Sequence, residues 1–147
     1  MNIFESVICH DYTVVRTHRE ILAVKTNGIH MVGLAWVCNV LTLIGLVIVY
    51  LLLTNQSTEV YDVLASIRYW ELAGRLGILI FLALVYFMSF GAYGGKAIFL
   101  DIVRRFSKLE EEEKHAVAKR GGRYFYLSLL SFLIVSGVVV YLIKYVY

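Results

Sequence analysis

The sequence predicts an all-α integral membrane protein with three transmembrane helices, and three observations support this prediction. Hydrophobic residues make up 60% of the 147 residues, and the mean hydropathy is +0.74, too apolar for a soluble domain of this size. The chain has no proline, which favours long uninterrupted helices. Its apolar residues gather in three segments, each long enough to cross ~30 Å of hydrocarbon at ~1.5 Å per residue. We therefore treat residues 1–147 as a single membrane domain.

The N-terminal flank, residues 1–30, combines charges with apolar residues at helical spacing. This pattern predicts an amphipathic helix on the cytoplasmic membrane surface or against a partner, with Asn27-Gly28 as its C-terminal cap. The flank lacks the apolar core of a signal peptide, so we expect it to be retained. Residues 31–53 carry no charge and predict the first transmembrane helix.

An outer loop, residues 54–71, follows the first span, and apolar positions at helical spacing predict a short interfacial helix over residues 59–71. The second span is expected at residues 72–95. Gly91 and Gly95 near its end form a GxxxG pattern, which predicts close approach of another helix.

Residues 96–123 form a charged connection, predicted to be an amphipathic cytoplasmic extension of the second span that stops at Gly121-Gly122. The third span is expected at residues 124–147. The apolar face of the connection consists of Phe99, Ile102, Val103, Phe106 and Leu109.

A straight extension of the second span would leave this apolar face in water. Either the helix bends at Gly94-Gly95 and lies on the membrane, or a partner covers the face. The acidic run that begins at Glu110 would be repelled by anionic headgroups, which favours a partner over residues 97–119.

The orientation follows from the distribution of Lys and Arg. The N-terminal flank and the second connection together hold eleven of them, whereas the outer loop, the start of the second span and the C-terminal end hold three. Because cytoplasmic segments are enriched in Lys and Arg, we expect the N-terminus inside and the C-terminus outside the plasma (inner) membrane.

His30 is the candidate cofactor ligand, because a histidine at the start of a span can hold haem. The stretch IHMVGLAW resembles the start of the first helix in copper-resistance D and protoporphyrinogen-oxidase-type membrane proteins, which have four or more spans. An axial pair needs a second histidine at similar depth, and neither other span has one. We therefore interpret His30 as structural and expect no cofactor or metal.

These patterns predict a non-catalytic accessory or scaffolding subunit of a larger membrane complex. The spans hold essentially no ionisable residue, and no nucleophile has a base placed to activate it. The expected partners are other integral membrane subunits and the bilayer, not nucleic acid, because the clustered basic residues are a topology signal. Two alternatives stay open: a haem- or quinone-associated anchor of an electron-transfer complex, and a small oligomeric channel or transporter.

Overall fold

The computed structural model describes residues 1–15, 21–54, 62, 65 and 71–146, and the described residues form helices without a strand. The elements in chain order are α1 (Ile3–Val15), α2 (Ile21–Leu53), α4 (Glu71–Tyr93), α5 (Lys96–Ser107), α6 (Glu111–Tyr141) and a terminal π-helical turn, η1 (Leu142–Val146). The predicted interfacial helix at residues 59–71 falls almost wholly outside the described residues.

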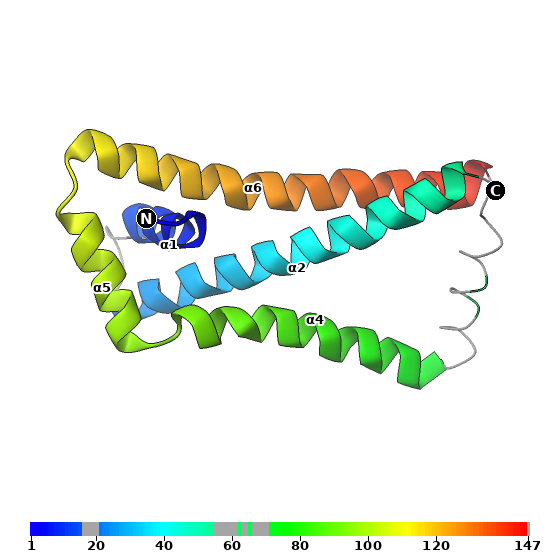
Figure 1. Cartoon of the computed structure of the whole chain (residues 1–147), viewed down its shortest axis with the longest axis horizontal. Coiled ribbons are helices and arrows are strands. Elements are labelled where there is room, and N and C mark those ends of the chain that lie inside the picture. The colour runs from blue at the N-terminus through cyan, green and yellow to red at the C-terminus, as the bar shows by residue number, and fades with distance from the viewer. Residues whose placement is uncertain (16–20, 55–61, 63–64, 66–70, 147) are drawn as a thin grey trace.

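Three helices are long and apolar enough to cross a membrane, which confirms the all-α class and the three candidate spans. These candidate spans lie within Asn27–Leu53, Arg75–Tyr93 and Glu111–Tyr145. In Figure 1, α2 runs between α6 and α4, with α1 and α5 at one end of the molecule and the C-terminus at the other. We refer to the end that holds α1 and α5 as the polar end.

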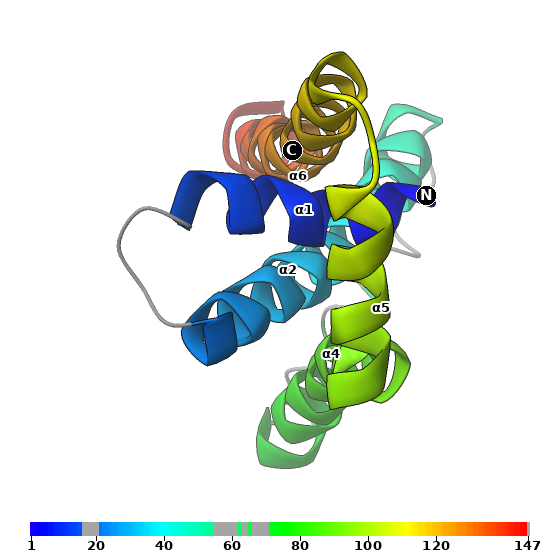
Figure 2. The same ribbon diagram turned by 90° about the vertical axis from the view of Figure 1, so that its left-hand side faces the viewer.

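Helix α1 lies across the polar end, beneath α6 and above α2, with α5 in front of it (Figure 2). The larger of two hydrophobic clusters is at this place, and its buried members are Val7, Ile8, Cys9, Val32, Phe99, Ile102 and Phe106. A second, small cluster joins Leu52 to Leu142 at the opposite end. The packing of the protein is therefore concentrated around α1.

The expected end of the N-terminal helix at Asn27-Gly28 is wrong, because α2 begins at Ile21 and continues through both residues. Gly28 is buried against α1, where an added Cβ would lie 3.2 Å from the Cα of Ile8. This glycine permits close packing of two helices and does not form a turn.

The expected helix stop at Gly121-Gly122 is also wrong, and for the same reason. Helix α6 passes through both glycines, and a Cβ at Gly121 would lie 1.9 Å from the backbone oxygen of Ser6. The chain instead breaks after Ser107, and α6 starts at Glu111 with a capping box in which Glu110 and Glu113 each accept a backbone N–H of the other. The acidic run thus occupies a helix N-terminus, where negative charge is favourable.

The second span and the charged connection are separate helices, not one continuous helix. Helix α4 ends at Tyr93, Gly95 has an extended backbone (φ −65°, ψ 131°), and α5 then runs across the ends of the spans (Figure 1). Of the two arrangements considered for this segment, the chain adopts the bend at Gly94-Gly95.

The glycines of the predicted GxxxG pattern contact no other helix among the described residues. Gly91 is exposed on α4, where an added Cβ would meet nothing within 4 Å, and Gly95 faces only Ile98 of its own helix. The close crossings occur on α2 instead, where Gly33 meets Tyr86 of α4 and Gly45 meets Val135 of α6.

Gly121→Ala should release α1, because the new methyl group would overlap the backbone of Ser6. We expect a loss of about 1–3 kcal/mol in unfolding free energy, as for an overpacked core. Gly137→Ala in the same helix meets no atom within 4 Å and should gain about 0.5–1 kcal/mol. Thermal unfolding in detergent measures both variants, and equal shifts would contradict a close contact at Gly121.

Candidate functional site

The best-defined polar arrangement in the described residues surrounds the start of α1. Asn2 and Glu5 form a reciprocal cap: the Asn2 N–H donates to Glu5 Oε2 at 2.9 Å, and the Glu5 N–H donates to Asn2 Oδ1 at 2.8 Å. The cap satisfies backbone donors at the beginning of the helix. It also fixes the Glu5 carboxylate so that it faces α5.

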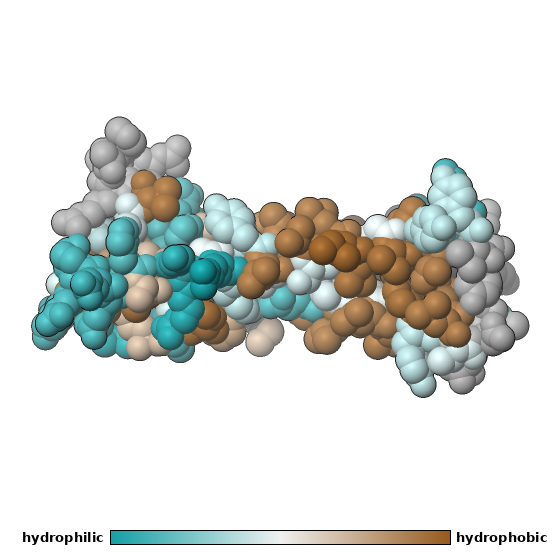
Figure 3. Space-filling view, turned by 90° about the horizontal axis from the view of Figure 1, so that it is seen from above, coloured by the Kyte–Doolittle hydropathy of each residue, from teal (hydrophilic) through white to brown (hydrophobic). Residues whose placement is uncertain are grey.

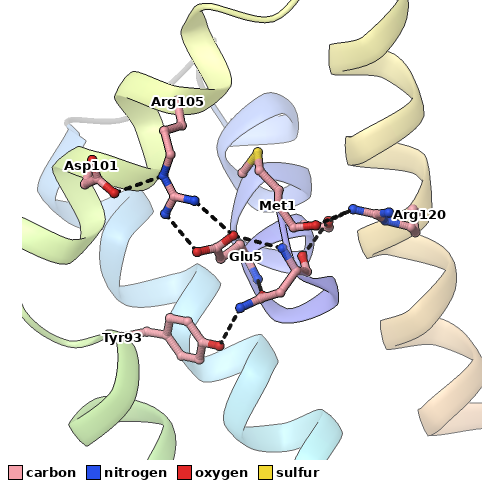
Figure 4. A network of polar contacts seen from close by, with 8 residues as sticks. Met1, Glu5, Tyr93, Asp101, Arg105 and Arg120 are labelled. Carbon is pink, nitrogen blue, oxygen red and sulfur yellow. Dashed lines mark hydrogen bonds and ion pairs between the residues drawn. The ribbon is translucent and has the colours of Figure 1, made fainter.

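Glu5 joins α1 to α5 through a two-pronged ion pair with Arg105 (Figure 4). Nη2 of Arg105 lies 2.8 Å from Glu5 Oε1 and Nη1 lies 3.4 Å from Oε2, while Nε donates to Asp101 at 2.9 Å. The side chain of Glu5 is only 12% exposed, so water screens this pair less than an ordinary surface pair. Arg105 is therefore held between two carboxylates of different elements.

Burial alone would raise the pKa of the Glu5 carboxyl. The hydrogen bonds from Arg105 and the Asn2 backbone, together with the charge of Arg105, outweigh burial and bring the pKa below its ordinary value of 4.5. The same contacts raise the pKa of Arg105. The pair is thus charged at neutral pH and contributes to the docking of α1.

Arg120 and Tyr93 connect α1 to α6 and to the end of α4. Arg120 Nη2 donates to the Met1 carbonyl oxygen at 2.8 Å and to Ser6 Oγ at 3.0 Å. The amide of Asn2 donates to the Tyr93 hydroxyl at 3.4 Å. Figure 4 shows these groups converging on the first turn of α1 from three directions.

An aromatic cluster lies next to this network. The Phe4 ring meets the edges of Trp36 and Tyr124 at centroid distances of 5.3 and 5.8 Å, and it lies 6.4 Å from Tyr93. Tyr124 also accepts a hydrogen bond from the Asn39 amide at 2.7 Å, which ties α2 to α6. One phenylalanine of α1 therefore contacts all three long apolar segments near their polar ends.

Cys9 lies beneath this layer and is 2% exposed. Burial, with a smaller effect of the Glu5 charge, raises the pKa of its thiol to about 12. The thiolate is the reactive form, so a docked α1 keeps Cys9 unreactive. Cys38 is also a free cysteine.

His30 packs between α2 and α4. Its ring stacks on Tyr86 with the centroids 5.8 Å apart, meets Phe90 edge to face, and hydrogen-bonds through Nδ1 to the Tyr86 hydroxyl. No cluster of three potential metal ligands occurs among the described residues. His30 thus forms a contact between α2 and α4.

The structure brings some of the predicted partner-binding residues together, but they pack against α1 of the same chain. Phe99, Ile102 and Phe106 are buried against α1, with Val103 and Leu109 packed around them. The expectation that this face is open to a partner is wrong, because α1 of the same chain covers it. Glu110 is exposed at the start of α6, and Gly91 and Gly95 lie elsewhere.

Sequence reasoning missed α1 as the cover for α5 and missed the Glu5–Arg105 pair. One signal was present: residues 1–28 and 97–109 are both amphipathic, and both are expected on the same side of the membrane. Two unpartnered apolar faces in one compartment can cover each other.

Comparison with known proteins gives no match with a protein-family model, a curated protein or a solved structure. The functional argument therefore depends on the geometry of this chain.

The Glu5→Gln variant should loosen α1 while keeping its cap, because glutamine can also accept the Asn2 N–H. Loss of the ion pair should cost about 1 kcal/mol, which corresponds to roughly fivefold faster alkylation of Cys9 at neutral pH. Peptide mass spectrometry resolves Cys9 from Cys38. Glu112→Gln, an exposed acid on α6, is the matched control and should leave the rate unchanged.

Protonation of Glu5 at low pH should loosen α1, as the Glu5→Gln substitution does. Since the pKa of Glu5 is lowered in the folded protein, its contribution is complete above about pH 4.5 and is lost as the pH falls below that value. The melting temperature should therefore be measured at pH 5.5 and pH 3.5, ~1 unit above and below that value. The decrease between these two conditions should be larger for the unmodified protein than for Glu5→Gln. Parallel curves would exclude Glu5 as the group responsible.

Proposed function

We propose that the protein is a non-catalytic accessory or scaffolding subunit of a larger membrane complex, and that it binds a transmembrane helix of another subunit through α4. The observation that supports this proposal is an exposed stripe on α4, which we name the α4 outer stripe. It consists of Gly77, Phe81, Leu84, Met88 and Gly91.

The α4 outer stripe points away from α2, on which α4 packs through Ser89 and Tyr86. Phe81, Leu84 and Met88 are 51%, 62% and 62% exposed. A Cβ added at Gly77 or Gly91 would meet nothing within 4 Å. The two glycines and Leu84 are spaced by seven residues, so they share the face that a neighbouring helix would contact in a left-handed crossing.

Small residues matter here because apolar surface alone does not drive association in lipid. Helices associate in a bilayer where their backbones can approach closely, and glycine permits that approach. A stripe with a glycine at each end and large side chains between them offers shape complementarity to one helix. The rest of the exposed span surface suits lipid chains.

The polar end supports a second, electrostatic contact in the cytoplasm. With Phe99, Ile102 and Phe106 of α5 buried against α1, the surface that α5 and the start of α6 leave exposed carries many charges beside the apolar Ile98 and Leu100. The charged residues include Arg104, Lys108, Glu110, Glu112 and Glu113. Contacts there would be salt-dependent. For the haem- or quinone-associated anchor, and for the channel or transporter, no observation in the described residues adds support.

The orientation in the plasma (inner) membrane is part of this proposal and can be measured directly. Thr58→Cys and Tyr147→Cys should react with an impermeant reagent added outside, whereas Glu112→Cys should react only after the membrane is opened. The reason is the excess of Lys and Arg at the polar end. The reverse pattern would place the polar end outside.

Gly77→Leu combined with Gly91→Leu should remove the protein from its complex without unfolding it. Leucine side chains would separate the two helix backbones, and we expect at least about tenfold less co-purifying partner in mild detergent. Gly137→Leu on α6 also meets empty space and serves as the matched control. Partner yields that remain at the level of the control would show that the α4 outer stripe contacts lipid.

A further inference from the structure

A groove follows α6 beside α1, where the chain passes from charged to apolar residues, and we name it the α1–α6 groove. Its lower part, about 380 Å³, is lined by His10, Lys119, Arg123, Tyr126, Leu127 and Leu130. A wider pocket of about 640 Å³ shares His10 and Lys119 with it and continues to His115. On the face seen from the α6 side, hydrophilic residues cover the polar end and hydrophobic residues cover the middle (Figure 3).

The charged part of the groove is basic, and it has no counter-ion among the described residues. Lys119 and Arg123 are exposed and lie one turn apart on α6. Neither side chain forms an ion pair with a described residue, unlike Arg105, Lys114 and the hydrogen-bonded Arg120. Of the residues that the structure describes, no Asp or Glu lines either pocket.

The lower part of the groove is apolar and open. Tyr126, Leu127 and Leu130 are 59%, 59% and 52% exposed, and they continue the same face of α6 away from the two cations. The Tyr126 ring stands edge to face with His10, whose centroid is 6.2 Å away. This contact places an imidazole, able to donate an N–H, at the boundary between the basic and the apolar parts.

We propose that the α1–α6 groove binds one anionic phospholipid. Its phosphate lies between Lys119 and Arg123 with an N–H donated by His10, and one acyl chain follows Tyr126, Leu127 and Leu130. The two cations favour an anionic headgroup, and the apolar row of Tyr126, Leu127 and Leu130 favours a ligand that also has an acyl chain. A free phosphate ion would leave this apolar row uncovered. The groove follows α6 and the α4 outer stripe follows α4, which lie on opposite sides of α2 (Figure 1). The lipid site does not depend on the accessory role.

The test measures which lipids the full chain retains. The protein is reconstituted in vesicles of equal phosphatidylglycerol and phosphatidylcholine, extracted in mild detergent and analysed by native mass spectrometry. We expect one retained phosphatidylglycerol per chain. Each Lys or Arg near an anionic lipid contributes roughly a factor of five in binding, so Lys119→Gln with Arg123→Gln should weaken retention about 25-fold.

The matched control is Arg104→Gln with Lys108→Gln, which removes two exposed cations at the C-terminal end of α5 and the same net charge. It should retain phosphatidylglycerol as the unmodified protein does, and so should Lys119→Arg with Arg123→Lys. Leu127→Asn with Leu130→Asn should weaken retention without a change of charge. Circular dichroism and elution volume establish that each variant is folded.

Three results would overturn the proposal. Equal loss in the α5 control would mean that total charge attracts the lipid, with no site. Unchanged retention after removal of Lys119 and Arg123 would place the lipid elsewhere. Displacement of phosphatidylglycerol by excess inorganic phosphate, with no effect of the two asparagine substitutions, would identify a simple anion site and exclude binding of an acyl chain along the apolar row.

Discussion

The contact between the backbones of α1 and α6 is the constraint on which the polar end depends. At Gly121 an added Cβ would lie 1.9 Å from the Ser6 oxygen, so only a glycine lets α1 lie against α6 at this point. Once there, α1 covers Phe99, Ile102 and Phe106 of α5 and places Glu5 beside Arg105. A small residue in one helix therefore determines how an apolar face on another is removed from water.

The two ends of the molecule are held by different forces. The polar end has a buried cluster, an ion pair and an aromatic layer around Phe4, because apolar side chains there would otherwise meet water. Along the three candidate spans few residues are buried within the chain, and such an apolar surface would suit lipid chains. The candidate spans still pack along their length, with contacts such as Gly45 against Val135, Gly33 against Tyr86 and the Asn39–Tyr124 hydrogen bond. That difference explains a buried cluster at one end and largely exposed helices beyond it.

The spans could be predicted from the sequence because an apolar stretch of sufficient length is a local property. The helix boundaries could not, and the errors have one cause. Asn27-Gly28 and Gly121-Gly122 match local signals for a helix end, yet all three glycines serve contacts with α1, a separate helix. Likewise, the spacing of Phe99, Ile102 and Phe106 predicts a face that must be covered, but amphipathic spacing does not identify the cover. The Glu5–Arg105 pair spans a hundred positions, and no local pattern indicates it.

The long sequence separation between α1 and the part of α6 that it contacts has a consequence during synthesis of the chain. Ser6 leaves the ribosome long before Gly121 is made, and at about 5–20 residues per second the delay is roughly 6–23 s. During that interval α1 can already contact α2 and α5, but it lacks its contact with α6. The last helix to be synthesised thus completes the packing of the first.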